Sequence, residues 1–272
     1  MAFERFADVL SREQHADGGL GWTAGATAEP EPTALLALAL DDDRARRWLL
    51  EHQGPDGAVV LETGEVRNTG AAALTALALP TEQARLDALA FAVGAVGSRL
   101  DTPDAADDPL GWPWVPGTYA WVEPTARVLL ATRALRPSDE ATTSDALTIL
   151  RDREVDGGGW NYGNSSVRGT DLTPYAQTTA MACIALHGMD EPCLERGLEA
   201  LRRLLRVETG GLSLAMGAEA LRLDGRDEES YGETVAALAS QYDRTGFLGN
   251  LGTLAWAALA TRDGRSPLEV DG

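Results

Sequence analysis

The chain contains no lysine, and all 23 of its fixed positive charges are arginines. Without that amine, Schiff-base chemistry and a Walker-type lysine on a nucleotide phosphate are excluded. The two cysteines, Cys183 and Cys193, are too few for a disulfide framework. No apolar run reaches the length of about eighteen residues that a membrane span needs, and residues 1–6 do not begin a signal peptide. We therefore expect a cytoplasmic protein with no transmembrane segment.

Positive charge is also scarce relative to negative charge. The net charge is −19 and the isoelectric point lies near 4.5. A nucleic-acid partner or an anionic membrane surface needs basic patches, so both are excluded. What the chain has in quantity is hydrophobic residues, which make up 44% of 272 positions. That amount supports a sizeable core in one large domain or two small ones.

Glycine-rich loops followed by apolar helical runs recur along the chain. The clearest copy joins the loop 156–164 to the run 177–186, and an N-terminal copy joins 14–22 to 31–40. When the copies are aligned, the two runs begin with Glu-Pro-Thr-Ala and Gln-Thr-Thr-Ala. Self-similarity at a spacing of roughly 40–50 residues indicates a repeat architecture, in which each unit buries its apolar face against its neighbours.

Hydrophobic periodicity predicts twelve helices, arranged as six hairpins. Half are apolar all round, which is typical of buried inner helices. The inner helices are expected at 31–40, 69–79, 123–135, 174–187, 212–222 and 251–261. Amphipathic outer helices are expected at 3–14, 41–52, 81–100, 140–153, 191–207 and 229–242.

Six hairpins whose inner helices stand parallel can close into a ring. We therefore predict an all-α protein with one α/α toroid over residues 1–265 and a polar tail over 266–272. An open superhelix would show the same local pattern. The oligomeric state is not predicted.

The loops carry a family resemblance. Gln14…Asp17-Gly18-Gly19…Trp22, Gln53…Asp56-Gly57 and Asp156-Gly-Gly-Gly-Trp160 resemble the glutamine–tryptophan repeats of the squalene-hopene cyclase and protein prenyltransferase superfamily. The resemblance implies an α/α toroid whose barrel holds an isoprenoid chain, here in a short single-domain form. It also implies that Gln14, Gln53 and Trp160 are structural staples between neighbouring units.

The chain departs from that family at its acidic motif. Class II cyclases protonate their substrate with Asp-x-Asp-Asp, whereas this chain has Asp41-Asp42-Asp43 and the spaced acids of 104–108. The zinc triad of the protein prenyltransferases cannot be assigned to any residues here. The resemblance therefore leaves the general acid to be found elsewhere.

The inner helices begin with polar residues that would share one rim of the ring. Glu31, Glu123 and Gln177 stand there, with Asn68 as a further member. Helix capping is one interpretation, because a carboxylate in the first turn complements the helix dipole. The other is a polar ring above an apolar shaft, containing an acid whose pKa is raised by burial. On that hypothesis Glu123 is the best candidate acid, and Glu31 and Asp171 are the other candidates.

Aromatic residues cluster in the loop that precedes Glu123. They either pack the rim of the barrel or line a pocket in which their faces stabilise a carbocation. The candidate substrate-binding residues from this loop are Trp112, Trp114, Tyr119 and Trp121. Trp160 and Tyr162 of the loop 156–164 and Gln177 of the rim are the other candidates.

Two patterns could hold metals. Cys183 and His187 stand four residues apart with Cys193 nearby, but their apolar surroundings favour a core cysteine and a helix-end histidine over zinc. The acidic stretch 101–108 would hold Mg²⁺ only if the substrate were a diphosphate, and a solvated loop is the simpler interpretation. We predict no other cofactor and no resident metal.

The first function hypothesis is a terpene cyclase-like enzyme that binds an isoprenoid or similar apolar molecule and cyclises or isomerises it after protonation. The second is a non-catalytic toroid that binds a lipid or a protein partner. The third is a carbohydrate-active toroid, in which Glu31 and Glu123 supply paired carboxylates.

Overall fold

The computed structural model describes residues 2–61, 67–98 and 109–270, and this part of the chain forms twelve helices and one short hairpin. The outer helices are α1 (Ala2–Glu13), α3 (Asp43–Glu51), α5 (Glu82–Gly94), α7 (Glu140–Asp152), α9 (Pro192–Leu205) and α11 (Glu228–Thr245). The inner helices are α2 (Pro30–Leu40), α4 (Thr69–Ala78), α6 (Val122–Leu135), α8 (Ala176–Leu186), α10 (Gly211–Asp224) and α12 (Leu251–Thr261). The hairpin pairs β1 (Ser166–Val167) with β2 (Thr170–Asp171) in antiparallel register.

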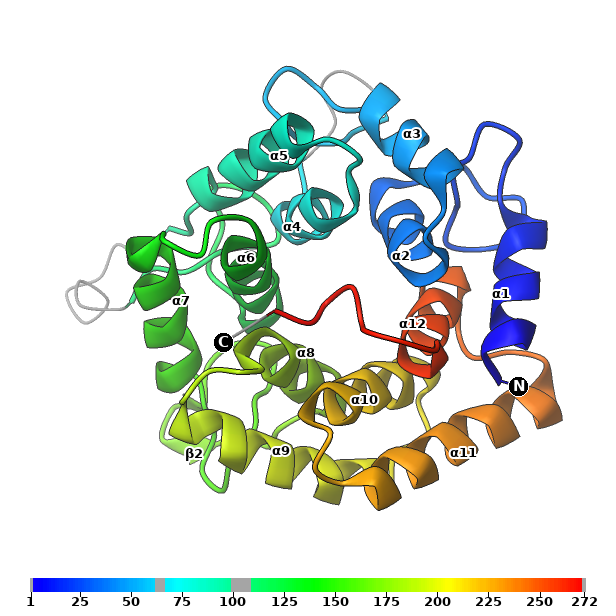
Figure 1. Cartoon of the computed structure of the whole chain (residues 1–272). Helices are drawn as coiled ribbons and strands as arrows, with labels where there is room; N and C mark the ends of the chain where they lie inside the picture. Colours follow the sequence, from blue (N-terminus) through cyan, green and yellow to red (C-terminus); the bar gives the residue numbers. More distant parts are fainter. Residues whose placement is uncertain (1, 62–66, 99–108, 271–272) are drawn as a thin grey trace.

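The inner helices close a ring, which Figure 1 shows end on with the outer helices around it. Each inner helix packs against the next one along the chain, and α12 packs against α2 to complete the circle. The first outer helix, α1, lies against the last inner helix, α12. The structure thus confirms the predicted all-α toroid. The open superhelix is excluded because the two ends of the repeat meet.

Small residues allow the inner helices to stand this close. In α4 every residue from Thr69 to Ala78 is buried, and the helix consists mostly of alanine and leucine. Outer helices bury only one face; α9, for example, keeps its charged residues on the solvent side. One predicted boundary was wrong: the outer helix expected over 81–100 ends at Gly94. Beyond it the backbone of Gly97 and Ser98 bonds to the loop before α6 instead of continuing the helix.

The two predicted glutamine staples tie each turn to the following outer helix. Gln14 Nε2 donates to a carbonyl of its own turn at 3.0 Å and to Asp42 Oδ1, at the start of α3, at 2.9 Å. Gln53 Nε2 donates in the same way to its own turn at 3.0 Å and to the carbonyl of Ala84 in α5 at 2.8 Å. In the clearest repeat Glu154 replaces the glutamine and forms an ion pair with Arg196 of α9.

Glycine is required at one position of these turns. Gly18, Gly57 and Gly158 have φ values of +104°, +89° and +90°, in the region that disfavours other residues. A Cβ at each would lie 2.4, 2.2 and 2.6 Å from a backbone carbonyl oxygen of the following outer helix. These three close approaches set the distance between successive units.

The recurring threonine of the inner-helix motif has a structural role. The Oγ1 atoms of Thr33, Thr125 and Thr179 accept the N–H of one residue of the preceding loop at 2.9, 3.0 and 3.0 Å. Each hydroxyl also donates to the carbonyl of that same loop residue. The Glu-Pro-Thr-Ala recurrence is therefore explained in part by loop anchoring.

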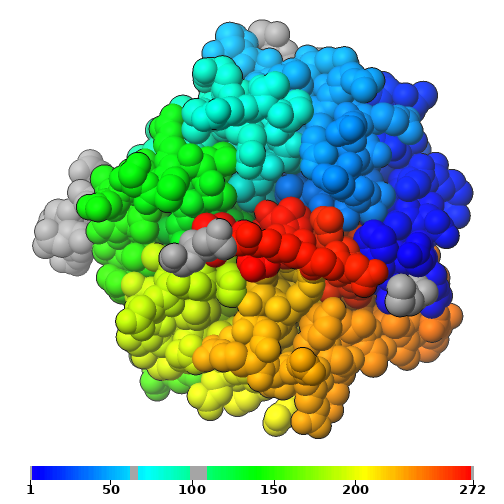
Figure 2. All heavy atoms as spheres, in the orientation of Figure 1, coloured from blue at the N-terminus to red at the C-terminus, as the bar shows by residue number. Residues whose placement is uncertain are grey.

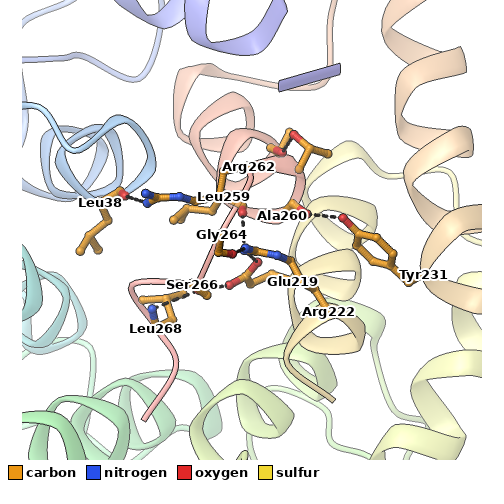
Figure 3. A network of polar contacts seen from close by, with 12 residues as sticks. Leu38, Glu219, Arg222, Tyr231, Leu259, Ala260, Arg262, Gly264, Ser266 and Leu268 are labelled. Carbon is orange, nitrogen blue, oxygen red and sulfur yellow. Dashed lines mark hydrogen bonds and ion pairs between the residues drawn. The ribbon is translucent and has the colours of Figure 1, made fainter. Parts of the chain in front are cut away.

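The C-terminal segment crosses the ring at the carboxyl ends of the inner helices, where Figure 2 shows it lying over the middle of this face. Arg262 donates to the carbonyl of Leu38 at the end of α2 at 2.8 Å. Leu268 is 1% exposed, so the segment is packed into the ring rather than resting on it. Figure 3 shows Glu219 of α10 bonded to Ser266 and Arg222 beneath the segment. The ring is thus covered at one end.

Candidate functional site: a cavity at the amino ends of the inner helices

The other end of the ring contains a central cavity of about 340 Å³, a size within the usual range of ligand sites. Five of the six inner helices line it, and they do so at two levels. The upper level is the second residue of each helix: Glu31, Glu123, Gln177, Leu212 and Gly252. The lower level, one helical turn deeper, consists of Leu35, Arg127, Met216 and Trp256.

Two loop tryptophans complete the wall. Trp114 lies over Gly70 of α4, and Trp22 lies over Gly252 of α12; a Cβ on either glycine would be 2.7 and 2.5 Å from the indole. The backbone carbonyls of the same tryptophans accept the first N–H of these helices, each at 2.9 Å. Glycine at the second helical position therefore makes room for an inward-facing indole.

A buried arginine joins the two candidate acids. Arg127 Nη2 lies 2.8 Å from Glu31 Oε1 and 2.7 Å from Glu123 Oε1, and Gln177 Nε2 donates to Glu123 Oε2 at 3.1 Å. The Arg127 guanidinium carbon is 5.1 Å from the centre of the Trp114 ring. Arg127 Nε and Nη1 are buried without a hydrogen-bond partner among the described residues.

The charges of this cluster do not balance, because two carboxylates face one guanidinium. Glu123 is 3% exposed, and burial is the main cause that raises its pKa; the negative charge of Glu31 raises it further. The charge of Arg127 and the hydrogen bond from Gln177 oppose the shift. Burial lowers the pKa of Arg127, but its two carboxylate partners outweigh this and raise it, so the guanidinium stays charged. Burial thus favours the protonated form of Glu123.

Glu31 and Glu123 lie in the first turns of α2 and α6, where a carboxylate complements the helix dipole, but neither is the N-cap residue. Both occupy the second helical position, and the residues that precede α2 and α6 make no side-chain cap. Asn68, the further rim residue, does cap its helix, with Oδ1 accepting the N–H of Ala71 at 2.8 Å. The rim is therefore of mixed character, with a cap at α4 and an ion-paired acid cluster at α2 and α6.

The structure divides the predicted aromatic group into three. Only Trp114 faces the central cavity. Trp112 and Trp160 are buried in the repeat interfaces, where their Nε1 atoms donate to the carbonyls of Val93 and Leu150 at 3.0 and 2.7 Å. These contacts are those of structural staples. The remaining three rings line a separate cavity on the outer side of α6 and α8: Tyr119, Trp121 and Tyr162.

Asp171 is not brought to the acids. It lies exposed in β2, paired with Ser166, and lines neither cavity, so Glu31 and Glu123 are the two predicted acids that meet.

Cys183 is buried in α8, and burial raises the pKa of its thiol. Cys193 is also buried, which raises the pKa of its thiol to about 11. Within the described ranges, no three His, Cys, Asp or Glu side chains are grouped as a metal site.

The acidic stretch 101–108, considered above for Mg²⁺, falls within residues 99–108 and so lies outside the described residues. None of the described helices has both the length and the apolar character that a membrane span needs.

Comparison with solved structures identifies the architecture. A protein from Actinoplanes matches 95% of this chain over 97% of its own, with a TM-score of 0.60 and 16% identity. The type II terpene cyclase MstE from Scytonema matches 88% of this chain over 77% of its own, with a TM-score of 0.57 and 14% identity. The chain has a terpene cyclase-like helical fold.

The same architecture occurs in a third solved structure. Haptocorrin in complex with Cbi matches 99% of this chain over 68% of its own, with a TM-score of 0.55 and 13% identity. No protein-family model matches the chain, and no curated protein matches its sequence. At these identities the likeness establishes the fold, and function has to be argued from the cavity.

Several cavity residues were not predicted from the sequence: Trp22, Leu35, Arg127, Met216 and Trp256. A usable signal exists for Arg127, which is a charged residue within an inner helix and stands four residues after Glu123. Trp22 was noted in its loop, but its inward direction depends on Gly252, which is distant in the sequence.

Proposed function

We propose that the protein binds an isoprenoid or similarly apolar molecule in the central cavity and cyclises or isomerises it by protonating a carbon–carbon double bond. The observation that supports this most directly is the sharing of one buried guanidinium by Glu31 and Glu123 inside a wall that includes three tryptophans. A variant of MstE was solved with geranylgeranyl dihydroxybenzoate, its substrate, which shows that a related fold accommodates an isoprenoid chain.

In the proposed reaction the protonated carboxyl group of the pair, assigned to Glu123, gives its proton to one alkene carbon. The π electrons form the new C–H bond and leave a cation at the other carbon. Loss of a proton from a neighbouring carbon to the Glu123 carboxylate restores a double bond. The product is then an isomer of the substrate, and the acid is regenerated without a cofactor.

The cavity is suited to stabilise the cation. The faces of Trp22, Trp114 and Trp256 offer cation–π attraction in a partly desolvated site, and the acid cluster carries excess negative charge. Gln177 bonds Glu123 Oε2, and because an amide has both donor and acceptor ends, a rotation allows it to serve either protonation state.

The experiment is incubation with geraniol, farnesol and geranylgeraniol in D₂O, followed by mass spectrometry of the extracted products. An isomer or cyclised product carrying one deuterium is expected. Glu123→Gln should lower its rate of formation by about 10²- to 10⁴-fold, the usual contribution of a general acid. Glu229→Gln, an exposed change on α11, is the matched control and should leave the rate unchanged. Turnover by Glu123→Gln at the original rate would refute this assignment.

A second candidate, a non-catalytic lipid-binding toroid, is favoured by one observation. The ion pair with Arg127 favours the carboxylate form of Glu123, which has no proton to donate. In that case native mass spectrometry would detect a retained apolar ligand, while no deuterium-labelled product would form.

Glycoside hydrolysis in this cavity is disfavoured, because Arg127 Nη2 contacts both carboxylates and occupies the place that a sugar would need.

A further inference from the structure

A second cavity, of about 510 Å³, lies on the outer side of the amino ends of α6 and α8. Four aromatic side chains line it and are 40% to 52% exposed: Tyr119, Trp121, Tyr162 and Tyr175. Clusters of large exposed aromatic side chains mark interaction sites more often than chance surface composition does. The proposed acid chemistry makes no use of these rings.

The break in the repeat explains why these rings face outward. Tyr162 occupies the loop position of Trp22 and Trp114, since its carbonyl also accepts the first N–H of the preceding inner helix, Val122, at 3.0 Å. At the second position of that helix, however, stands Glu123 and not glycine. The space that receives an indole in the other two units is absent, so Tyr162 remains 47% exposed.

Three of the rings lie close together. The centres of Tyr162 and Tyr175 are 5.0 Å apart with 31° between the ring planes. A Cβ on Gly163 would lie 3.5 Å from the Trp121 ring, so the backbone rests against that indole. Asn161 is buried and holds the loop, with Nδ2 donating to a carbonyl at 2.8 Å and Oδ1 accepting the N–H of Gly163 at 2.9 Å. These bonds hold the loop that carries Tyr162.

The rest of the described lining mixes apolar side chains with neutral polar ones and is almost uncharged. Asn164 and Thr173 present neutral hydrogen-bonding groups, and among the described residues Arg153 is the one charged side chain of the lining. Arg153 is itself paired with Asp152 at 3.1 Å. The chain's net charge of −19 disfavours an anionic ligand. The ligand that suits this lining is neutral, with apolar C–H faces to lie on the rings and hydroxyl groups to meet the amides.

We propose that this outer cavity binds a neutral saccharide, either free or as the sugar of a glycoside. Its sugar ring would lie on Trp121 and the Tyr162–Tyr175 pair, with hydroxyl groups directed to Asn164 and Thr173. This site is independent of the proposed proton transfer, because it uses none of the central-cavity residues.

The test is isothermal titration of the full chain with maltotriose, cellotriose and xylotriose. At least one should bind with a Kd of ~1 mM or tighter. Trp121→Ala and Tyr175→Ala should each raise that Kd at least tenfold. Two variants should leave it unchanged: Trp114→Ala in the central cavity, and Phe247→Ala, a 60% exposed ring that lines neither cavity.

Several outcomes would overturn the proposal. One is no measurable heat with any of the three sugars up to ~20 mM while circular dichroism shows a folded chain. Another is equal affinity in Trp121→Ala and the unmodified protein. A third is binding of a proline-rich peptide, a ligand that also docks in aromatic-lined grooves, in place of the sugars. Glu123→Gln should retain saccharide binding, which separates this result from the test of the proposed function.

Discussion

Replacing Glu219 with glutamine should remove much of the protein's loss of stability between pH 5 and pH 8. Glu219 is fully buried in α10 beneath the C-terminal segment (Figure 3). Its carboxyl oxygens accept one hydrogen bond from the hydroxyl of Ser266 and one from Arg222 Nη1, the latter at 3.3 Å. Burial outweighs these two partners, which favour the anion, and raises the pKa of Glu219 to about 7.

The sign follows from the direction of the shift. A carboxyl with a folded-state pKa near 7 and an unfolded value of 4.5 binds its proton more tightly when folded. Its contribution to stability is complete below about pH 4.5 and is lost as the pH rises through about 7. At 1.36 kcal/mol per pKa unit, the loss between pH 5 and pH 8 is about 2 to 3 kcal/mol, or roughly 5–10 °C in Tm for a chain of this length.

The assay is urea unfolding, followed by circular dichroism, of the unmodified protein and Glu219→Gln at pH 5, 6, 7 and 8. Other titrating groups are common to both proteins, so the difference between their curves isolates Glu219. The stability of the unmodified protein relative to Glu219→Gln should fall by about 2 to 3 kcal/mol across this range. Glu229→Gln, on the exposed side of α11, should run parallel to the unmodified protein. Parallel curves for Glu219→Gln as well would refute the reasoning.

Two further predictions concern the repeat and the acid cluster. Gly158→Ala should destabilise the protein more than Gly157→Ala in urea unfolding. Both glycines have positive φ, and the strain of an alanine in that conformation costs about 1–2 kcal/mol at either position. Only at Gly158 would the added Cβ also lie against a carbonyl oxygen, at 2.6 Å. Equal effects would show that the close approach is not limiting. Arg127→Met should destabilise by about 3–5 kcal/mol near pH 7, since it leaves Glu31 and Glu123 without their ion-pair partner. The cost should shrink as the pH falls and Glu123, whose pKa burial raises, is protonated. A cost independent of pH would mean that the lost ion pairs are not its cause.

The two ends of the helical ring differ in chemistry. At the carboxyl ends of the inner helices the segment after α12 covers the ring, with Arg262 and Arg222 donating to the terminal carbonyls of α2 and α12. Cations at helix carboxyl ends are favoured by the helix dipole. At the amino ends the acids Glu31 and Glu123 face a hollow. Access to the cavity is therefore expected from the acidic end.

The sequence by itself determined the helices, their alternation and the staples. These features rest on short-range patterns: an apolar run buried on all sides, a glycine that the turn requires, and a glutamine that bonds within its own turn. Gln14 and Gln53 are examples, because each contacts a carbonyl four residues away as well as the next helix. The polar rim of Glu31, Glu123 and Gln177 was also predictable, since parallel inner helices place their first turns at one end of the ring.

Only the tertiary structure decided what the rim residues contact and where the aromatic rings point. Trp114 faces inward because Gly70, more than forty positions away, leaves space for it, whereas Tyr162 faces outward beside Glu123. Arg127 pairs with Glu31 across the ring, a contact that closure creates and that no local pattern encodes. Side-chain direction at a ring's mouth depends on the volume left by neighbouring helices, and that volume is set by packing between residues remote in sequence.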